Sequence, residues 1–267
     1  MRRAIDSPSL RHSLLGIVLY LQLSSAWAAD PDAWRPLADS APDSAGIYNG
    51  VVTTAHPAVA KLLIGYPGGT GLCSGTLIAP AIVLTAAHCL TDNTTRVNAV
   101  FFDGTSDRSY KAISYAIHPD YNDWLWPLSD IALLALESPV EGVSPLPIAV
   151  QVPPKRSRGI IVGFGEDNTA RVGAKRMGTV RLSRCPRRPL PAAYLDAGQL
   201  EHSLCWHPQG RHSDTCNGDS GGPLIIDGAV AGVTSGGYPR CHGRLSWNTN
   251  VALFSGWISA VVAESPQ

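Results

Sequence analysis

Short runs of β-forming residues, interrupted by Gly, Pro, Asn or Asp, cover most of the chain after residue 50. Such runs are typical of antiparallel strands joined by tight turns. They fall into two series, which are separated by a proline-rich stretch at residues 143–154. Each series has the length of a small closed barrel, roughly 100 residues. We therefore expect an all-β protein built from two packed six-stranded antiparallel β-barrels.

The expected strands of the first series are residues 59–64, 73–78, 81–85, 97–102, 112–118 and 131–136. Those of the second series are residues 159–164, 178–182, 223–226, 229–234 and 248–252. Near the end of the chain, residues 256–262 space their apolar side chains as one face of a helix. We expect a short C-terminal helix there.

The first 29 residues have the composition of a secretory signal peptide. Three arginines accompany an apolar run at residues 14–23, and Ala26 and Ala28 lie where a signal peptidase inspects the chain. A membrane-spanning helix needs about 20 apolar residues, so this run is too short to cross a bilayer. We expect an exported protein without a membrane span, secreted to an extracellular or periplasmic space.

Residues 30–46 are rich in Pro, Asp, Ser and Ala and lack a periodic apolar pattern. Such a composition fits a flexible tail, and it fits a pro-segment that is removed during maturation. Composition alone leaves both interpretations open.

The chain has six cysteines, an even number that predicts three disulfides in an oxidising compartment. Six cysteines allow 15 pairings, and their spacing alone does not select one. The sequence contains no Cys-x-x-Cys pair and no His-Glu-x-x-His run. We therefore expect no metal site.

The formal net charge is zero and the isoelectric point is about 7.1. This balance argues against nucleic acid or a membrane surface as a partner. Basic residues gather locally at residues 156–158, 171–181 and 184–188. We interpret these stretches as solvated loops.

Residues 214–224 contain the run Gly-Asp-Ser-Gly-Gly-Pro, which suits a tight loop that exposes the hydroxyl of Ser220 and leaves backbone N–H groups free. A serine hydroxyl is a weak nucleophile until a base removes its proton. His88, in Thr-Ala-Ala-His-Cys, and Asp130, in Asp-Ile-Ala-Leu-Leu, supply a base and a carboxylate. The chain order His, Asp, Ser is that of one known arrangement of the catalytic triad.

In these three motifs and their order the chain resembles the chymotrypsin/trypsin family of secreted serine endopeptidases, over residues 47–263. The resemblance implies that Ser220 is the nucleophile, His88 the general base and Asp130 the residue that orients the imidazole. It also implies an oxyanion hole made by the backbone N–H groups of Gly218 and Ser220. No cofactor is expected, and the resemblance implies a monomer that acts on protein or peptide substrates and meets protein inhibitors.

The resemblance also selects one disulfide pairing. It implies Cys73–Cys89 beside the histidine, Cys185–Cys205 in the second half of the chain and Cys216–Cys241 across the specificity pocket.

Ile47 begins a run, Ile-Tyr-Asn-Gly, that is similar to the start of the mature enzymes of this family. There, cleavage before the isoleucine frees an α-amino group that pairs with the aspartate next to the catalytic serine, which is Asp219 here. We therefore favour a pro-segment over a tail, and a zymogen. Residue 46 is Gly, where a trypsin-like activator would need Lys or Arg, so another activating protease is expected. The expected organisation is a signal peptide at 1–29, a pro-segment at 30–46 and a peptidase domain at 47–267, with barrels at about 47–150 and 151–267.

Asp214 lies six residues before Ser220, where trypsin-like members carry the aspartate of the primary pocket. The resemblance implies cleavage after Arg or Lys, with Ser235, Gly237 and Ser246 as further substrate-binding residues. Two features leave an alternative open. Ser246 replaces a pocket glycine of the family, and Arg240, next to Cys241, is expected to be able to swing towards Asp214 and neutralise it. A non-basic primary specificity is that alternative, and a catalytically silent binding module is the rival from another class.

The histidines outside these motifs, at positions 56, 118, 202, 207, 212 and 242, are expected on the surface or in loops.

Overall fold

The computed structural model describes residues 47–102, 105–122, 128–187, 200–208, 212–238 and 241–265, and the backbone of Arg35–Pro36. The expected signal peptide, all but two residues of the expected pro-segment, and Arg240 lie outside this part of the chain. Within it, no helix has both the length and the apolar character needed to cross a membrane.

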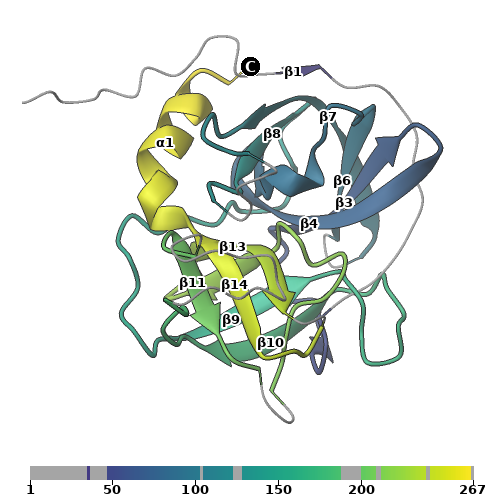
Figure 1. Ribbon diagram of the computed structural model, residues 1–267. Coiled ribbons are helices and arrows are strands. Elements are labelled where there is room, and N and C mark those ends of the chain that lie inside the picture. The colour runs from purple at the N-terminus through teal and green to yellow at the C-terminus, as the bar shows by residue number, and fades with distance from the viewer. Residues whose placement is uncertain are drawn as a thin grey trace, which may run out of the picture.

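The first series of strands forms a closed six-stranded barrel, in which β7 pairs with both β6 and β8 (Figure 1). Its strands are β3 (Val59–Tyr66), β4 (Gly69–Ala79), β5 (Ile82–Thr85), β6 (Arg96–Phe102), β7 (Asp107–Ile117) and β8 (Ala132–Leu136). The two-residue strand β1 (Arg35–Pro36) pairs with β7. All five residues of β8 are buried, because its inner face fills the barrel and its outer face is covered by neighbouring segments. Each of these two faces carries both small Ala and larger Leu side chains.

The second series forms a seven-stranded antiparallel sheet in the order β11-β14-β13-β12-β9-β10-β2. Its strands are β2 (Val51–Val52), β9 (Arg158–Gly163), β10 (Arg176–Arg181), β11 (Ser203–Trp206), β12 (Pro223–Ile226), β13 (Ala229–Tyr238) and β14 (Leu245–Asn250). An isolated bridge between Ser183 and Cys205 links the residues after β10 to β11. That bridge connects the two ends of the strand order, near β10 and at β11.

Each half of the chain lends one segment to the other. Ile47 is fully buried in the apolar cluster of the second sheet, and β2 pairs with β10. In the opposite direction, helix α1 (Ser255–Ala263) lies beside the first barrel (Figure 1). Its Trp257, Ile258 and Val261 side chains pack into the core of that barrel. These exchanges tie the two units together across the region where the His88, Asp130 and Ser220 motifs meet.

Two strands of the second sheet, β2 and β11, were not expected from the sequence, and β14 was expected too late in the chain. The two residues of β2 are too few to form a pattern. β11 was not expected, because its four residues lie between loops and have no alternating pattern. β14 begins at Leu245, three residues before the expected strand, because Leu245 and Ser246 pair with the end of β13, at Tyr238 and Gly237. Gly236 and Gly237, near that end of β13, are not typical strand residues, so no strand was predicted there.

His118, which was expected on the surface or in a loop, lies in the loop after β7, but its side chain is buried. His118 is 3% exposed, and its ring centroid lies 5.0 Å from those of both Phe254 and Trp257. The burial lowers the pKa of this histidine, against a weaker opposing effect of Asp120. His118 is therefore part of the contact between the first barrel and the C-terminal segment.

Candidate active site

The loop that carries Ser220 precedes β12 and is held against β13 by backbone hydrogen bonds. Gly221 N–H donates to Thr234 O over 2.8 Å, and Thr234 N–H donates to Gly222 O over 2.8 Å. Gly221 has a φ of 80°, and a Cβ at this position would overlap the Thr85 hydroxyl. The glycine after Ser220 is therefore required both by its left-handed backbone and by the close approach of the first barrel.

Ser74 of β4 fixes this loop from the first barrel. Its N–H donates to Ser220 O over 2.7 Å, and its hydroxyl donates to Gly218 O over 3.0 Å. The same hydroxyl accepts a hydrogen bond from Phe164 N–H over 3.1 Å. Sequence reasoning missed Ser74, because one serine beside a cysteine in a strand carries no distinguishing signal.

The two residues whose carbonyl groups Ser74 binds each have a backbone N–H that is free. Among the described residues, neither Gly218 N–H nor Ser220 N–H donates a hydrogen bond within the protein. Gly218 has a φ of 93°, a backbone conformation that favours glycine. Two unpaired N–H groups beside a serine hydroxyl form a site where a developing negative charge on oxygen can be stabilised.

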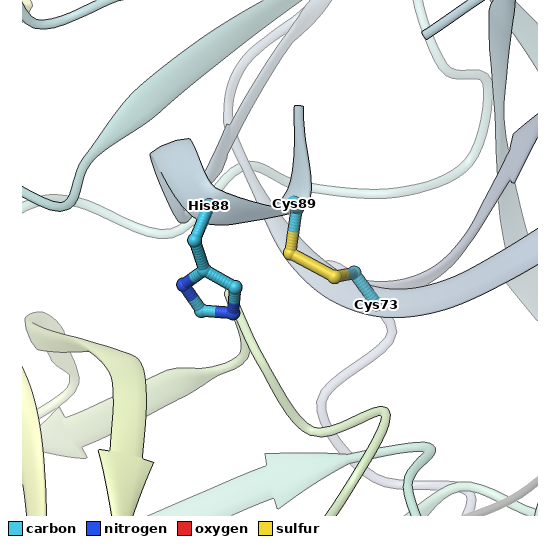
Figure 2. A group of neighbouring side chains, drawn as sticks. All are labelled: Cys73, His88 and Cys89. Atoms are coloured by element: carbon cyan, nitrogen blue, oxygen red, sulfur yellow. A yellow bond between two sulfur atoms is a disulfide. The ribbon is translucent and has the colours of Figure 1, made fainter. Parts of the chain in front are cut away.

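His88 projects from the short helical turn η1 (Ala87–Cys89), next to the Cys73–Cys89 disulfide (Figure 2). Its Nδ1 lies 2.7 Å from Asp130 Oδ2, and its backbone N–H donates to Asp130 Oδ1 over 2.9 Å. The His88 side chain is 26% exposed, whereas that of Asp130 is fully buried. The carboxylate accepts the Nδ1 proton, so Nε2 is left as the basic nitrogen of the neutral ring.

Asp130 keeps its charge although it is buried. Burial alone would raise the pKa of this carboxyl, but the attraction of His88 and the hydrogen bonds from His88 and Ser235 together hold it below its ordinary value. The Ser235 hydroxyl donates to Asp130 Oδ2 over 2.5 Å, and Thr249 Oγ1 donates to Asp130 O over 2.8 Å. Ser235 and Thr249 lie on β13 and β14. The second sheet therefore holds Asp130 in place by hydrogen bonds, although Asp130 belongs to the segment before β8, the last strand of the first barrel.

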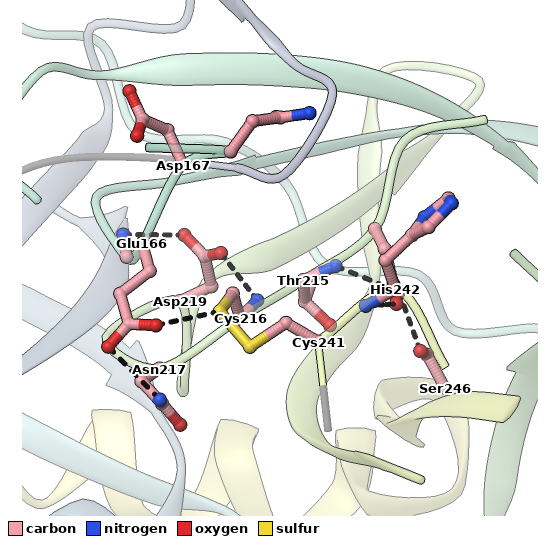
Figure 3. Close-up of a disulfide and its surroundings, with 12 residues drawn as sticks. Glu166, Asp167, Thr215, Cys216, Asn217, Asp219, Cys241, His242 and Ser246 are labelled. Carbon is pink, nitrogen blue, oxygen red and sulfur yellow. Dashed lines mark hydrogen bonds between the residues drawn. A yellow bond between two sulfur atoms is a disulfide. The ribbon is translucent and has the colours of Figure 1, made fainter. Parts of the chain in front are cut away.

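Three disulfides are present, Cys73–Cys89, Cys185–Cys205 and Cys216–Cys241. They are the pairs that the family resemblance implied. The sulfur atoms of two of them lie near His88 and near Glu166 (Figures 2 and 3). Because a metal is bound by a thiolate, these disulfide sulfurs offer no such ligand.

Asp214 is fully buried, and it lies two residues before Cys216, which forms a disulfide with Cys241. Its Oδ1 accepts hydrogen bonds from the Ser246 hydroxyl over 2.6 Å and from Thr215 N–H over 2.9 Å. Its Oδ2 accepts one from His242 N–H over 2.8 Å. Burial raises the pKa of Asp214, and these hydrogen bonds oppose the increase without cancelling it.

Ser246 and Gly237 face each other in the pairing of β14 with β13. A Cβ on Gly237 would lie 3.2 Å from the Ser246 hydroxyl, so the serine occupies space on this side of the region. The structure therefore brings Asp214, Gly237 and Ser246 together. Arg240 lies outside the described residues.

Asp219 is a buried carboxylate whose hydrogen bonds come only from backbone donors in the described part of the chain (Figure 3). Gly165 N–H donates to its Oδ1 over 2.7 Å and Cys216 N–H to its Oδ2 over 2.8 Å. Burial raises the pKa of Asp219 to about 7, and the nearby carboxylates Asp214 and Glu166 add to the increase. No described residue forms an ion pair with Asp219 that would offset this desolvation.

The segment after Ile47 reaches the same region. Tyr48 and Asp214 exchange two backbone hydrogen bonds of 3.0 Å, and the Ile47 side chain is fully buried. The start of the expected mature chain is therefore joined directly to the strand-like segment that leads to Asp219 and Ser220.

Comparisons with known proteins agree with this geometry. A family model described as Trypsin matches residues 47–258. Tonin from Rattus norvegicus is 31% identical over 214 residues, covering 73% of this chain and 82% of tonin. Kallikrein 1-related peptidase b3 from Mus musculus is 31% identical over 215 residues, with the same shares covered. Submandibular glandular kallikrein-9 from Rattus norvegicus is 30% identical over 218 residues, covering 74% of this chain and 83% of that protein.

Proposed function

Because this chain belongs to the trypsin family and is a serine endopeptidase, we propose that it cleaves peptide bonds with Ser220, His88 and Asp130 as its catalytic triad. The observation that carries the proposal is the geometry of the site. Asp130 Oδ2 lies 2.7 Å from His88 Nδ1, and the loop that carries the Ser220 hydroxyl has two free backbone N–H groups, those of Gly218 and Ser220. Together they offer a base, a nucleophile and an oxyanion site. A binding module would need none of these.

In the proposed mechanism, His88 Nε2 removes the Ser220 proton as Oγ forms a bond to the substrate carbonyl carbon. The carbonyl π electrons move to oxygen, where the N–H groups of Gly218 and Ser220 stabilise the oxyanion. Its collapse breaks the C–N bond, and protonated His88 gives its proton to the leaving amine. Water then repeats the sequence on the acyl-enzyme, with His88 again as the base. Asp130 remains ionised and stabilises the imidazolium.

For the primary specificity, we propose Arg or Lys on the acyl side of the cleaved bond. A buried carboxylate such as Asp214 selects an opposite charge because its desolvation is only partly offset by hydrogen bonds. The alternative is a neutral side chain, and the Ser246 hydroxyl favours it by occupying Asp214 Oδ1. Peptide cleavage separates these two possibilities.

For maturation, we propose a signal peptide at residues 1–29, a pro-segment at 30–46 and activation by cleavage before Ile47. The buried, cation-free Asp219 supports this proposal, since a new α-ammonium group would neutralise it. Residue 46 is Gly, so the activating protease is not one that requires a basic residue. The disulfides fit export to an oxidising extracellular space, where protein substrates and protein inhibitors are the proposed partners.

The test is to incubate protein that begins at Ile47 with a diverse peptide mixture and to sequence the products. Ser220→Ala protein is the matched control. Cuts after Arg and Lys that are absent in the control support both the triad and Asp214. Ser220-dependent cuts after other residues keep the enzyme and refute the pocket assignment. Folded protein without Ser220-dependent cutting refutes the triad and favours the binding module.

A further inference from the structure

Basic residues from two separate sequence stretches meet on one surface of the second sheet. Lys155 and Arg156 lie in the turn before β9, and Arg181 and Arg184 lie at the end of β10 and just beyond it. These four side chains line a cavity of about 560 Å³. Lys155 and Arg184 also line an adjoining cavity of about 550 Å³. The two cavities together are called the basic groove below.

Strand pairing brings the two stretches together. In the antiparallel pair β9–β10, Arg158 is directly opposite Arg181. Beyond the strands, Leu182 N–H donates to Ser157 O over 2.9 Å, and Arg181 Nε donates to Arg156 O over 3.2 Å. The basic stretches at 156–158 and 184–188, which the sequence presents as separate loops, are therefore neighbours.

The protein does not neutralise this charge within its described part. None of Lys155, Arg156, Arg158, Arg181, Arg184 and Arg187 forms an ion pair with a described residue, and all six are exposed. One carboxylate, Glu201, lines the second cavity. Like charges directly opposite each other in an antiparallel pair repel, so the Arg158–Arg181 pairing has an unfavourable term that a bound anion would relieve.

The backbone under the groove is fixed at two points. Ser183 N–H donates to Cys205 O over 2.8 Å, and a disulfide joins Cys185 to Cys205, which lies on β11. Arg184 lies between these two anchors. A ligand in the groove would therefore not have to order the backbone that carries Arg184, which lowers the entropic cost of binding.

We propose that the basic groove binds a linear sulfated polysaccharide. Guanidinium groups bind tetrahedral oxyanions through paired N–H donors, and two adjoining cavities fit successive charged groups of a polymer. Of the described residues, one apolar side chain, Leu182, and one ring, that of His207, line the first cavity, whereas the second cavity also has apolar lining, from Val152, Pro153, Leu200 and Leu204. Protein interfaces have apolar or aromatic centres, and single-stranded nucleic acids stack on aromatic side chains, so both fit the first cavity, where four of the basic side chains gather, less well.

The proposal is independent of the catalytic proposal. Neither cavity is lined by His88, Asp130, Ser220 or Asp214. The groove would therefore hold the enzyme on a sulfated matrix while short peptides still reach the catalytic residues. Its test measures binding, so it succeeds or fails whatever the outcome of the peptide-cleavage experiment.

The experiment measures the Kd for heparin at several NaCl concentrations, using protein secreted from the full-length chain with Ser220→Ala. The test variant also carries Arg156→Gly and Arg184→Gln. Arg156 has a φ of 70°, so glycine removes the charge and relieves backbone strain at that turn. The matched control carries Arg108→Gln and Arg171→Gln, which make the same change in net charge outside the groove.

We expect the test variant to bind heparin at least tenfold more weakly, and the control to stay within about twofold of the parent. The salt dependence of log Kd should also become less steep, by about two released counterions. Equal weakening in both variants would reduce the effect to net charge and overturn the proposal. So would equally tight binding of desulfated heparin, of polyglutamate or of phosphatidylserine vesicles. Matching thermal midpoints of the three proteins check that all are folded.

Discussion

The Ser235 hydroxyl and His88 Nδ1 share one carboxylate oxygen, Asp130 Oδ2, at distances of 2.5 and 2.7 Å. The hydroxyl comes from β13 of the second sheet, whereas the imidazole comes from the η1 turn of the first barrel. These two hydrogen bonds to a single oxygen therefore depend on how the first barrel and the second sheet are positioned relative to each other. This arrangement gives Ser235 a positioning role in the proposed catalytic triad.

Ser235→Ala should lower kcat with little change in KM for a short peptide. The charge-assisted hydrogen bond to Asp130 disappears, and the carboxylate becomes less firmly oriented and more readily protonated. A loss of about tenfold in kcat corresponds to about 1.4 kcal/mol of barrier. The pH profile should show the acidic limb of kcat moving to higher pH. Ser259→Ala, on the exposed face of α1, is the control, and an unchanged profile in Ser235→Ala would contradict the positioning role.

Ser74→Ala should reduce both stability and kcat. The substitution removes the hydroxyl that accepts from Phe164 N–H and donates to Gly218 O. A buried N–H left without a partner costs about 1–3 kcal/mol, and the loss of the hydrogen bond to Gly218 O would hold Gly218, whose N–H is the proposed oxyanion donor, less firmly in place. Urea unfolding and peptide hydrolysis measure the two effects. Ser109, exposed on β7, provides the control Ser109→Ala. Loss of stability with a normal kcat would show that Ser74 does not orient the oxyanion donors.

Asp219 should make the uncleaved chain less stable as the pH rises. Its pKa is about 7 in the folded chain, against an ordinary value of 3.8. The folded state therefore retains a proton that the unfolded state loses between these values. The contribution of Asp219 is fully present below about pH 4 and falls by on the order of 4 kcal/mol by about pH 7.

Urea unfolding of the uncleaved Ser220→Ala chain between pH 4 and pH 8 checks this dependence. Adding Asp219→Asn should flatten the curve, whereas Asp227→Asn, at an exposed turn, should not. Protein that begins at Ile47 should lose the decline as well, because the α-ammonium group would stabilise the ionised carboxylate. The same decline in protein that begins at Ile47 would refute the proposed ion pair.

Ser246→Gly should raise the preference for Arg over Lys at the primary site. The serine hydroxyl occupies Asp214 Oδ1, so its removal would let a guanidinium group reach both carboxylate oxygens, whereas an ammonium group needs only one. We expect the Arg/Lys ratio of kcat/KM to rise by about tenfold, or about 1.4 kcal/mol. Ser246→Ala removes the hydroxyl and keeps Cβ, so it separates hydrogen bonding from space. An unchanged ratio in both variants would show that Ser246 does not control access to Asp214.

Most of the strands and all the catalytic motifs were predictable from the sequence, since each depends on local composition. The strand β11 was not, because Ser203–Trp206 acquires its place only by pairing with β14. Ser74 gave no signal for the same reason. Its role arises where β4 meets a loop more than 140 residues later in the chain.

The sequence by itself determined the two series of short strands, the order of the histidine, aspartate and serine motifs, and the even number of cysteines. Neighbouring residues are enough to express such features. The tertiary structure alone decided that Ser235 shares the oxygen of Asp130 with His88, that Ser74 fixes the Gly218 peptide, and that Arg158 is opposite Arg181. These relationships depend on strand register and on how the two barrels pack, because they join residues that are far apart in the chain.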